Sequence, residues 1–574
     1  MSLYIPFEKG YGTYAGTVRT SRYVEGSDGT KLAVDIYLPA DGPGEVATGP
    51  FPLVLHAAKG GRRMGTGIDA ITAKLVANGY AHMFLETRGS GASYGYSNSF
   101  CEPLDARDVA AVIEWAAAQP WCNGKVGMRG ISNSGLIQEA TAAVCPEHLV
   151  AIAPVVCNSD FYYQNYPNGV SALPSGYMQM RGAFRPQIGA PVDDDPAPGY
   201  PQANAALLQQ RENKPFIGYT FTPNMCRDTI HEELGYAPNM DCAPIEFTEA
   251  IKSKGYLIFQ LGGWFDSGAG GQLITYKNWG GWITIGPWNH GESAFGESKL
   301  PNGNMDLPSL YLRWFDYALK GIDNGFDREP RVKFYTINAP KGQEWRTSAD
   351  WPPAGFDHNI FYLSGKGHDL SGKLEKSLPD AGAEEYKVDL TPEIFGPWGR
   401  MDSYITTDMT DRLDRKGLSF TSAPLEKDTE MTGHGVAELW VSSDAGDGNF
   451  ILVVEDVSET GKSSFVTIGV CRASHRKTTP NEAFNSVGIP YHRSYKEDLI
   501  PLELGVPAKL EFCIDPISYV FAAGHSIRVT LVCAEEKTYQ QPEGFDYENP
   551  PTITLYTGGD KASLVKLPLS STTG

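Results

Sequence analysis

The sequence has 574 residues, of which 41% are hydrophobic and 20% are charged, and this composition excludes a disordered chain. The formal net charge of −20 disfavours binding to nucleic acids and to anionic membrane surfaces. Nine cysteines without a C-x-x-C pair indicate buried thiols rather than disulfides or a zinc site. We expect no signal peptide and no membrane-spanning helix, and therefore a cytoplasmic protein with about three or four domains.

The first 158 residues alternate apolar strands with amphipathic helices. The predicted strands are a hairpin over residues 16–38, which turns at 27–30, and the segments 52–55, 81–86, 125–129 and 149–156. The predicted helices cover residues 68–76, 105–116, with Asp105 as the cap, and 136–143. This order predicts the first part of an α/β core, in which helices cover both faces of a parallel sheet.

Residues 159–250 interrupt this alternation and are rich in Tyr, Pro, Asn and Met. The alternation resumes over residues 251–353, with strands at 256–261 and 282–285 and helices near 270–278 and 307–319. We therefore predict a cap domain that is inserted between the two parts of a split α/β core. A long disordered loop would explain the many aromatic residues of the insert less well.

Residues 354–574 lose the helical periodicity and show short alternating strands instead. These strands are predicted at 359–363, 418–422, 437–442, 450–457, 465–470, 509–514 and 526–533. Turn-rich spacers separate them, which is typical of a β-sandwich. We predict a C-terminal β-sandwich or jelly-roll domain.

Residues 126–136 lie between a predicted strand and a predicted helix. Gly130 precedes Ser132 by two positions, and Ser134 and Gly135 follow it. Small residues on both sides of a serine suit the strained strand-to-helix turn called a nucleophile elbow. We interpret Ser132 as a nucleophile and the backbone N–H of Asn133 as an oxyanion donor. The alternative is a glycine-rich turn in which Ser132 only caps the helix.

Two further catalytic candidates follow later strands. Asp266 comes shortly after strand 256–261, and His290 comes shortly after strand 282–285. An α/β-hydrolase requires this chain order of serine, acid and histidine, each beyond a strand. We expect His290 to take the proton of Ser132 and return it to the leaving group, while Asp266 orients His290. Such a triad needs no metal ion and no organic cofactor.

Further motifs accompany these three residues. They stand at residues 87–93, 119–128, 319–325, 344–346, 350–352, 433–435 and 471–476. With them, the sequence resembles the cocaine esterase family, which also holds X-Pro dipeptidyl-peptidases, α-amino acid ester hydrolases and glutaryl acylases. The resemblance spans almost the whole chain. It implies an α/β-hydrolase core, an inserted, mainly helical cap and a C-terminal jelly roll of the galactose-binding-like kind.

The sequence departs from this family in the loop after the early strand. The family usually has a Tyr there as the second oxyanion donor, but residues 56–63 contain none. Losing one such donor typically costs about 2.7–4 kcal/mol of transition-state stabilisation. We expect a backbone N–H at Lys59 or Gly60, or the Lys59 side chain, to replace it. Alternatively, Lys59, Arg62 and Arg63 are solvated loop charges.

Aromatic residues near the triad are candidates for the substrate pocket. Tyr162, Tyr163 and Tyr166 lie at the start of the insert, and Trp264 and Trp288 flank the triad. The alternative role of these five residues is packing in the core.

These observations predict a serine hydrolase that cleaves an ester or amide bond through an acyl-enzyme. The expected partner is a small-molecule ester or amide or a short peptide, and a homo-oligomer is possible. The altered oxyanion loop also leaves open acyl transfer, cyclisation or C–C cleavage by the same triad. A third alternative is a ligand-binding protein with a vestigial triad.

Overall fold

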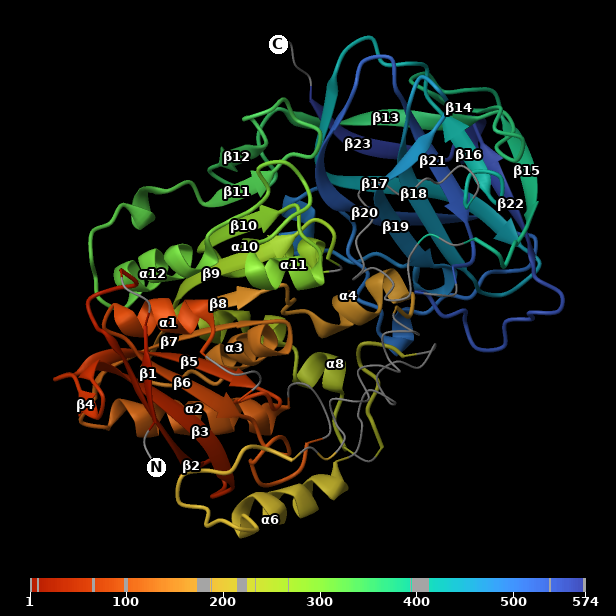
Figure 1. Ribbon diagram of the computed structural model, residues 1–574. Helices are drawn as coiled ribbons and strands as arrows, with labels where there is room; N and C mark the ends of the chain where they lie inside the picture. The colour runs from red at the N-terminus through yellow and green to blue at the C-terminus, as the bar shows by residue number, and fades with distance from the viewer. Residues whose placement is uncertain are drawn as a thin grey trace.

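The computed structural model contains two large β-sheets, which hold strands β1 to β12 and β13 to β23 (Figure 1). The described residues are 3–570, except for 8–9, 64–67, 98–101, 173–185, 187, 214–224, 233, 267, 393, 395–411 and 536–537. Among the described residues, no helix has the length and apolar character that crossing a bilayer requires.

The first sheet has the neighbour order β1-β2-β3-β6-β5-β7-β8-β9-β10-β11-β12, with β4 beside β3. Its strands are β1 (Leu3–Pro6), β2 (Gly16–Glu25), β3 (Lys31–Gly42), β4 (Glu45–Val46), β5 (Phe51–Ala58), β6 (Ala81–Glu86), β7 (Cys122–Ile131), β8 (Leu149–Val155), β9 (Leu257–Gly263), β10 (Trp282–Gly286), β11 (Val332–Tyr335) and β12 (Trp345–Ser348). All neighbours from β6 to β11 pair in parallel. The predicted parallel sheet is therefore confirmed.

Helices cover both faces of this sheet, as predicted. α1 (Ala70–Ala77) and α12 (Leu307–Ala318) share one apolar cluster with the sheet, and α2 (Pro103–Ala117) and α3 (Asn133–Ala143) share another. The predicted cap of α2 was wrong. Glu102 occupies the cap position, and Asp105 Oδ2 accepts the backbone N–H of Glu102 at 3.2 Å because the two residues form a capping box.

The described part of residues 159–250 consists of short helices and turns. The helices are α4 (Phe161–Asn165), α6 (Pro201–Gln209), α8 (Pro238–Asp241) and the start of α9 (Thr248–Lys254). This segment contacts both halves of the molecule: Gln210 Nε2 donates to Gly91 O at 2.7 Å, and Asn168 Nδ2 donates to Val470 O at 2.9 Å. Figure 1 shows α6 near the first sheet, and α4 beside the strand-rich domain.

The second sheet closes on itself, because β17 pairs with β20, β22 and β23. Its strands are β13 (Phe356–Ser364), β14 (Gly372–Glu375), β15 (Gly382–Lys387), β16 (Leu418–Thr421), β17 (Thr429–Ser443), β18 (Asn449–Val457), β19 (Ser463–Arg472), β20 (Ala508–Phe521), β21 (Ser526–Val532), β22 (Thr552–Thr557) and β23 (Leu564–Ser570). Ile285 and Phe334 of the first sheet belong to the same apolar cluster as Met431 and Phe512 of the second. The two halves are therefore joined by one continuous hydrophobic core.

Candidate active site

Ser132 stands at a strained turn between β7 and α3. Its φ of 57° and ψ of −119° are unusual for a residue with a side chain, and they match the strained turn of an elbow. A Cβ at Gly130 would lie 2.4 Å from Ser134 Cβ, and one at Gly135 would lie 2.8 Å from Cys157 Sγ. Strand and helix approach so closely here that neither glycine has room for a side chain.

Asp266 and His290 are paired directly. Asp266 Oδ2 lies 2.5 Å from His290 Nδ1, and Asp266 Oδ1 accepts the Gly268 N–H at 2.8 Å. The Asp266 side chain is 1% exposed and that of His290 is 28% exposed. Burial alone would lower the pKa of His290, but the charge and hydrogen bond of Asp266 outweigh it and raise that pKa above its ordinary value. The imidazolium form of His290 is thus stabilised.

Backbone hydrogen bonds join the loops that carry these residues. The Ser132 N–H donates to Val155 O at 2.9 Å, at the end of β8. The Trp264 N–H donates to Gly286 O, and the Phe265 N–H donates to Trp288 O, which ties the loop after β9 to the loop after β10. Since β7, β8, β9 and β10 are parallel neighbours, the three predicted catalytic residues follow strand ends at one edge of the sheet.

A short helix fixes the backbone of His290. α11 (His290–Phe295) begins at His290, and Asn289 caps it. Asn289 Oδ1 accepts the Glu292 N–H at 2.9 Å, and Glu292 Oε2 accepts the Asn289 N–H at 3.0 Å. This capping box holds the first helical turn, and therefore His290, in place.

The candidate oxyanion donors lie at the start of α3 and in the loop after β5. Asn133 is the first residue of α3 and directly follows Ser132. The Gly60 N–H donates to Ser90 Oγ at 3.1 Å, so this candidate donor already has a partner inside the protein. The Lys59 Nζ donates to Ser97 Oγ at 2.5 Å and lies 3.5 Å from Asp105 Oδ2.

The alternative interpretation of this loop as solvated charges was wrong. The Lys59 side chain is 4% exposed, and the Arg62 side chain is fully buried against Asp35 and Glu86. The Arg63 side chain is 27% exposed and pairs with Asp35. The loop is held by ion pairs whose acidic partners come from other strands and helices.

The aromatic candidates are mostly interior. Tyr162, Tyr166 and Trp288 are at most 1% exposed, and Trp264 is 6% exposed. The indole N–H of Trp264 donates to Tyr335 O, and that of Trp288 donates to Gly303 O. These contacts assign the indoles packing roles around the catalytic loops, while substrate contact by the five aromatic residues stays a prediction.

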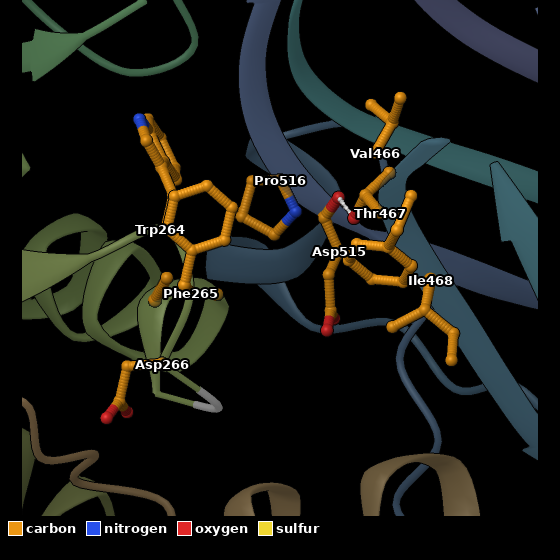
Figure 2. A pocket seen from close by; sticks show the side chains of 11 residues that line it. Trp264, Phe265, Asp266, Val466, Thr467, Ile468, Asp515 and Pro516 are labelled. Atoms are coloured by element: carbon orange, nitrogen blue, oxygen red, sulfur yellow. Dashed lines mark hydrogen bonds between the residues drawn. The ribbon is translucent and has the colours of Figure 1, made fainter. Parts of the chain in front are cut away.

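A small cavity lies beside the triad acid Asp266. The hydroxyl group of the partly buried Tyr163 lies near Gly270, one of the residues that line this cavity. The cavity has a volume of about 30 Å³, and Trp264, Phe265 and Asp266 line one side of it. Residues 465–468 of β19 and Asp515–Pro516 of β20 line the other side (Figure 2). Thr467 Oγ1 donates to Asp515 O at 2.8 Å, which fastens the two strands where they face the catalytic loop.

Sequence reasoning missed two groups behind the elbow. His56 Nε2 lies 3.2 Å from Ser134 Oγ, and Glu139 of α3 lies beside Cys157. The signal for Glu139 was that it is the one charged residue of α3, seven positions after Ser132. The described residues also contain one partly exposed group with metal-ligand spacing, Glu114, Glu147 and His148. It lies beside the start of β8, at the opposite end of the parallel strands from the triad.

The comparisons with known proteins agree with this architecture. Residues 28–292 match the family model of the X-Pro dipeptidyl-peptidase (S15 family), and residues 324–566 match that of the X-Pro dipeptidyl-peptidase C-terminal non-catalytic domain. A putative serine esterase of Mycobacterium bovis is 29% identical over 97% of this chain and 96% of its own length. The cocaine esterase of a Rhodococcus species is 25% identical over 90% of each chain.

A solved structure has the same fold. The CocE/NonD family hydrolase of Staphylococcus aureus aligns with a TM-score of 0.72 at 19% identity, over 96% of this chain and 94% of that one. Fold and sequence thus define a hydrolase with an S15 catalytic domain and a strand-rich C-terminal domain. The chain belongs to the family of cocaine esterases and X-Pro dipeptidyl-peptidases.

Proposed function

We propose that the protein hydrolyses an ester or amide bond of a small molecule or short peptide through an acyl-enzyme. Ser132 attacks the carbonyl carbon, and His290 takes the Ser132 proton and delivers it to the leaving group. Water then attacks the acyl-enzyme with His290 again as the base. The observation that carries this proposal is the 2.5 Å pair of His290 and Asp266 at the same sheet edge as the strained Ser132 turn.

The Asn133 N–H is the proposed first oxyanion donor, since it begins the helix that follows Ser132. Because the Gly60 N–H is bonded to Ser90, we favour the backbone N–H of Lys59 as the second donor. The Lys59 ammonium is the weaker candidate, since it is held by Ser97 and Asp105.

The finer domain roles belong to the same proposal. Residues 159–250 act as a cap that shapes the pocket, and residues 354–574 form a jelly roll whose β19–β20 edge supports the Asp266 loop. The relatives named as a cocaine esterase and as putative Xaa-Pro dipeptidyl-peptidases suggest small esters or short peptides as substrates. Cytoplasmic localisation, homo-oligomer formation and the lack of any cofactor requirement remain predictions.

Fluorophosphonate labelling tests the nucleophile. We expect one adduct per chain on Ser132 in the wild type, located by peptide mapping, and none in Ser132→Ala. Ser134→Ala is the matched control, because this serine lies two residues away and should leave the adduct in place. Hydrolysis in ¹⁸O-water would then incorporate the label into the acid product, whereas acyl transfer would not. A wild type that never reacts would contradict the proposal and favour the ligand-binding alternative.

A further inference from the structure

Glu139 is a buried acid directly behind the nucleophile. It lies in α3, seven residues after Ser132, which corresponds to about 10 Å of helical rise. The side chain is fully buried, and its Oε2 atom has no hydrogen-bond partner among the described residues. An ionised carboxylate in such a place would be strongly disfavoured, because it would lack both water and a counter-charge.

The Cys157 thiol connects Glu139 to the surroundings of the triad. Cys157 Sγ donates to Glu139 Oε1 at 3.5 Å. The same sulfur atom lies against Gly135, and the Cys157 carbonyl oxygen lies near Gly268, whose N–H binds Asp266. Burial, then the neighbouring Glu139 and Asp266, raise the pKa of the Cys157 thiol well above its ordinary value. Cys157 is therefore an uncharged thiol between two carboxyl groups.

Within the part of the chain that the structure describes, the elements packed on α3 bring no counter-charge to Glu139. These elements are α2, β5, β7, β8 and α9, with the short 3₁₀ turn Pro244–Phe247. Among the described residues, the titratable group that acts on Glu139 is Cys157. Burial raises the pKa of Glu139 to about 8, and the thiol hydrogen bond lowers it only in part.

We infer that Glu139 is a positioning residue of the proposed reaction, which must remain a neutral carboxylic acid so that the N-terminus of α3 can stabilise the oxyanion at Ser132. The inference rests on the proposed function of Ser132. Acylation places a negative charge on the carbonyl oxygen of the substrate beside the Asn133 N–H. A carboxylate two turns further along the same helix would repel that charge and oppose the helix dipole.

The size of this effect follows from distance and medium. At about 10 Å and an effective dielectric constant of about 20, the repulsion between two unit charges slows acylation roughly tenfold. A group with a pKa near 8 is about nine-tenths ionised at pH 9. The acylation rate of Ser132 should therefore fall on the alkaline side of its pH profile.

The test is the pH profile of fluorophosphonate labelling at Ser132 between pH 6 and pH 9.5. In the wild type, we expect the second-order rate to fall above pH 8 by roughly tenfold. Glu139→Gln keeps a neutral side chain of the same shape at every pH, so its profile should stay flat there. Glu139→Leu, also neutral, should give the same flat profile. This second variant shows that the effect comes from the missing charge and not from the amide group of glutamine.

Glu455→Gln is the matched control. Glu455 is equally buried but lies in β18 of the second sheet, so its replacement should leave the alkaline decline of the wild type unchanged. Cys157→Ala removes the hydrogen bond that lowers the Glu139 pKa, and should therefore move the decline to higher pH.

The outcomes separate the inference from the proposed function. An alkaline decline of equal size in wild type and Glu139→Gln, with Ser132 still labelled, would overturn the inference alone. No labelling of wild-type Ser132 at any pH would overturn the proposed function and the inference together.

Discussion

Buried acidic residues have different surroundings in the two sheets. In the first sheet, Asp266 leaves the end of a parallel strand and meets His290 from the next loop, with its other oxygen held by a backbone N–H. In the second sheet, Glu455 points into the interior from the middle of β18, and burial, followed by the charge of Asp414, raises its pKa well above the ordinary value. Parallel strands bring the loops that follow them to one edge of the sheet, whereas a closed, mainly antiparallel sheet offers no such edge.

This comparison predicts which replacements should change the reaction rate and which should change the stability of the fold. Charged residues at the parallel edge can meet a ligand, since loops from several strands converge there. Charged residues inside the closed sheet contact only other protein groups. Replacements at the edge should therefore change rates, and replacements in the interior or at the junction of the halves should change folding.

The largest expected effect is that of Asp266→Asn. The amide favours the wrong tautomer of His290 and removes the stabilising charge, so we expect kcat to fall about 10⁴-fold with the fold unchanged. Steady-state kinetics on a p-nitrophenyl ester, with circular dichroism, would measure this. Asp515→Asn, across the cavity from Asp266, is the control and should change kcat less than about threefold. A similar loss of kcat in Asp266→Asn and Asp515→Asn would contradict a catalytic role that is specific to Asp266.

The next effect concerns the junction of the two halves. Arg227 Nη1 and Nη2 donate to Asp160 Oδ1 and Oδ2 at 2.7 and 2.9 Å, and the Arg227 N–H donates to Ser494 O. Arg227→Met leaves the Asp160 carboxylate buried without its partner, so we expect the free energy of unfolding to fall by about 3–5 kcal/mol. Urea denaturation followed by Trp fluorescence would measure the loss.

An exposed arginine provides the comparison for Arg227. Arg328 pairs with Asp323 on the surface, and Arg328→Met should leave the urea midpoint close to that of the wild type. If the urea midpoint of Arg227→Met matched that of Arg328→Met, the Arg227–Asp160 pair would not stabilise the junction of the two halves.

The smallest expected effect on rate is that of Lys59→Met. The ammonium group is held by Ser97 and Asp105, so we expect kcat to change less than about threefold, whereas loss of a true oxyanion donor costs about 10²–10³-fold. Stability should fall, because Asp105 is left buried without a counter-charge. A loss of kcat near the upper figure, with an unchanged KM, would instead make the Lys59 side chain the second donor.

Much of the parallel edge was predictable from the sequence. Ser132, Asp266 and His290 each follow a short apolar strand, and the chain order alone indicated that parallel strand ends bring them to one edge. The strands of residues 356–570 with strong alternation were also predicted. β14, β15, β22 and β23 were not, because the first three are short and all four leave many side chains partly exposed.

The groups that sequence reasoning missed depend on partners far away in the chain. Arg62 looked like a loop charge because Asp35 and Glu86, its acidic partners, belong to β3 and β6. Glu139 looked like an ordinary helical acid, since only the packing of α3 on the end of β8 brings it to Cys157. Burial of a charge is a tertiary property, and neither spacing nor composition encodes it locally.

Closure of the second sheet also sets an order of events during synthesis. β23 fills the gap between β13 and β17, so the ring stays open until residue 570 has left the ribosome. β19 and β20, which face the Asp266 loop across the cavity, belong to that same ring. During synthesis, Ser132 is therefore present long before β19 and β20 can take their final places beside the Asp266 loop.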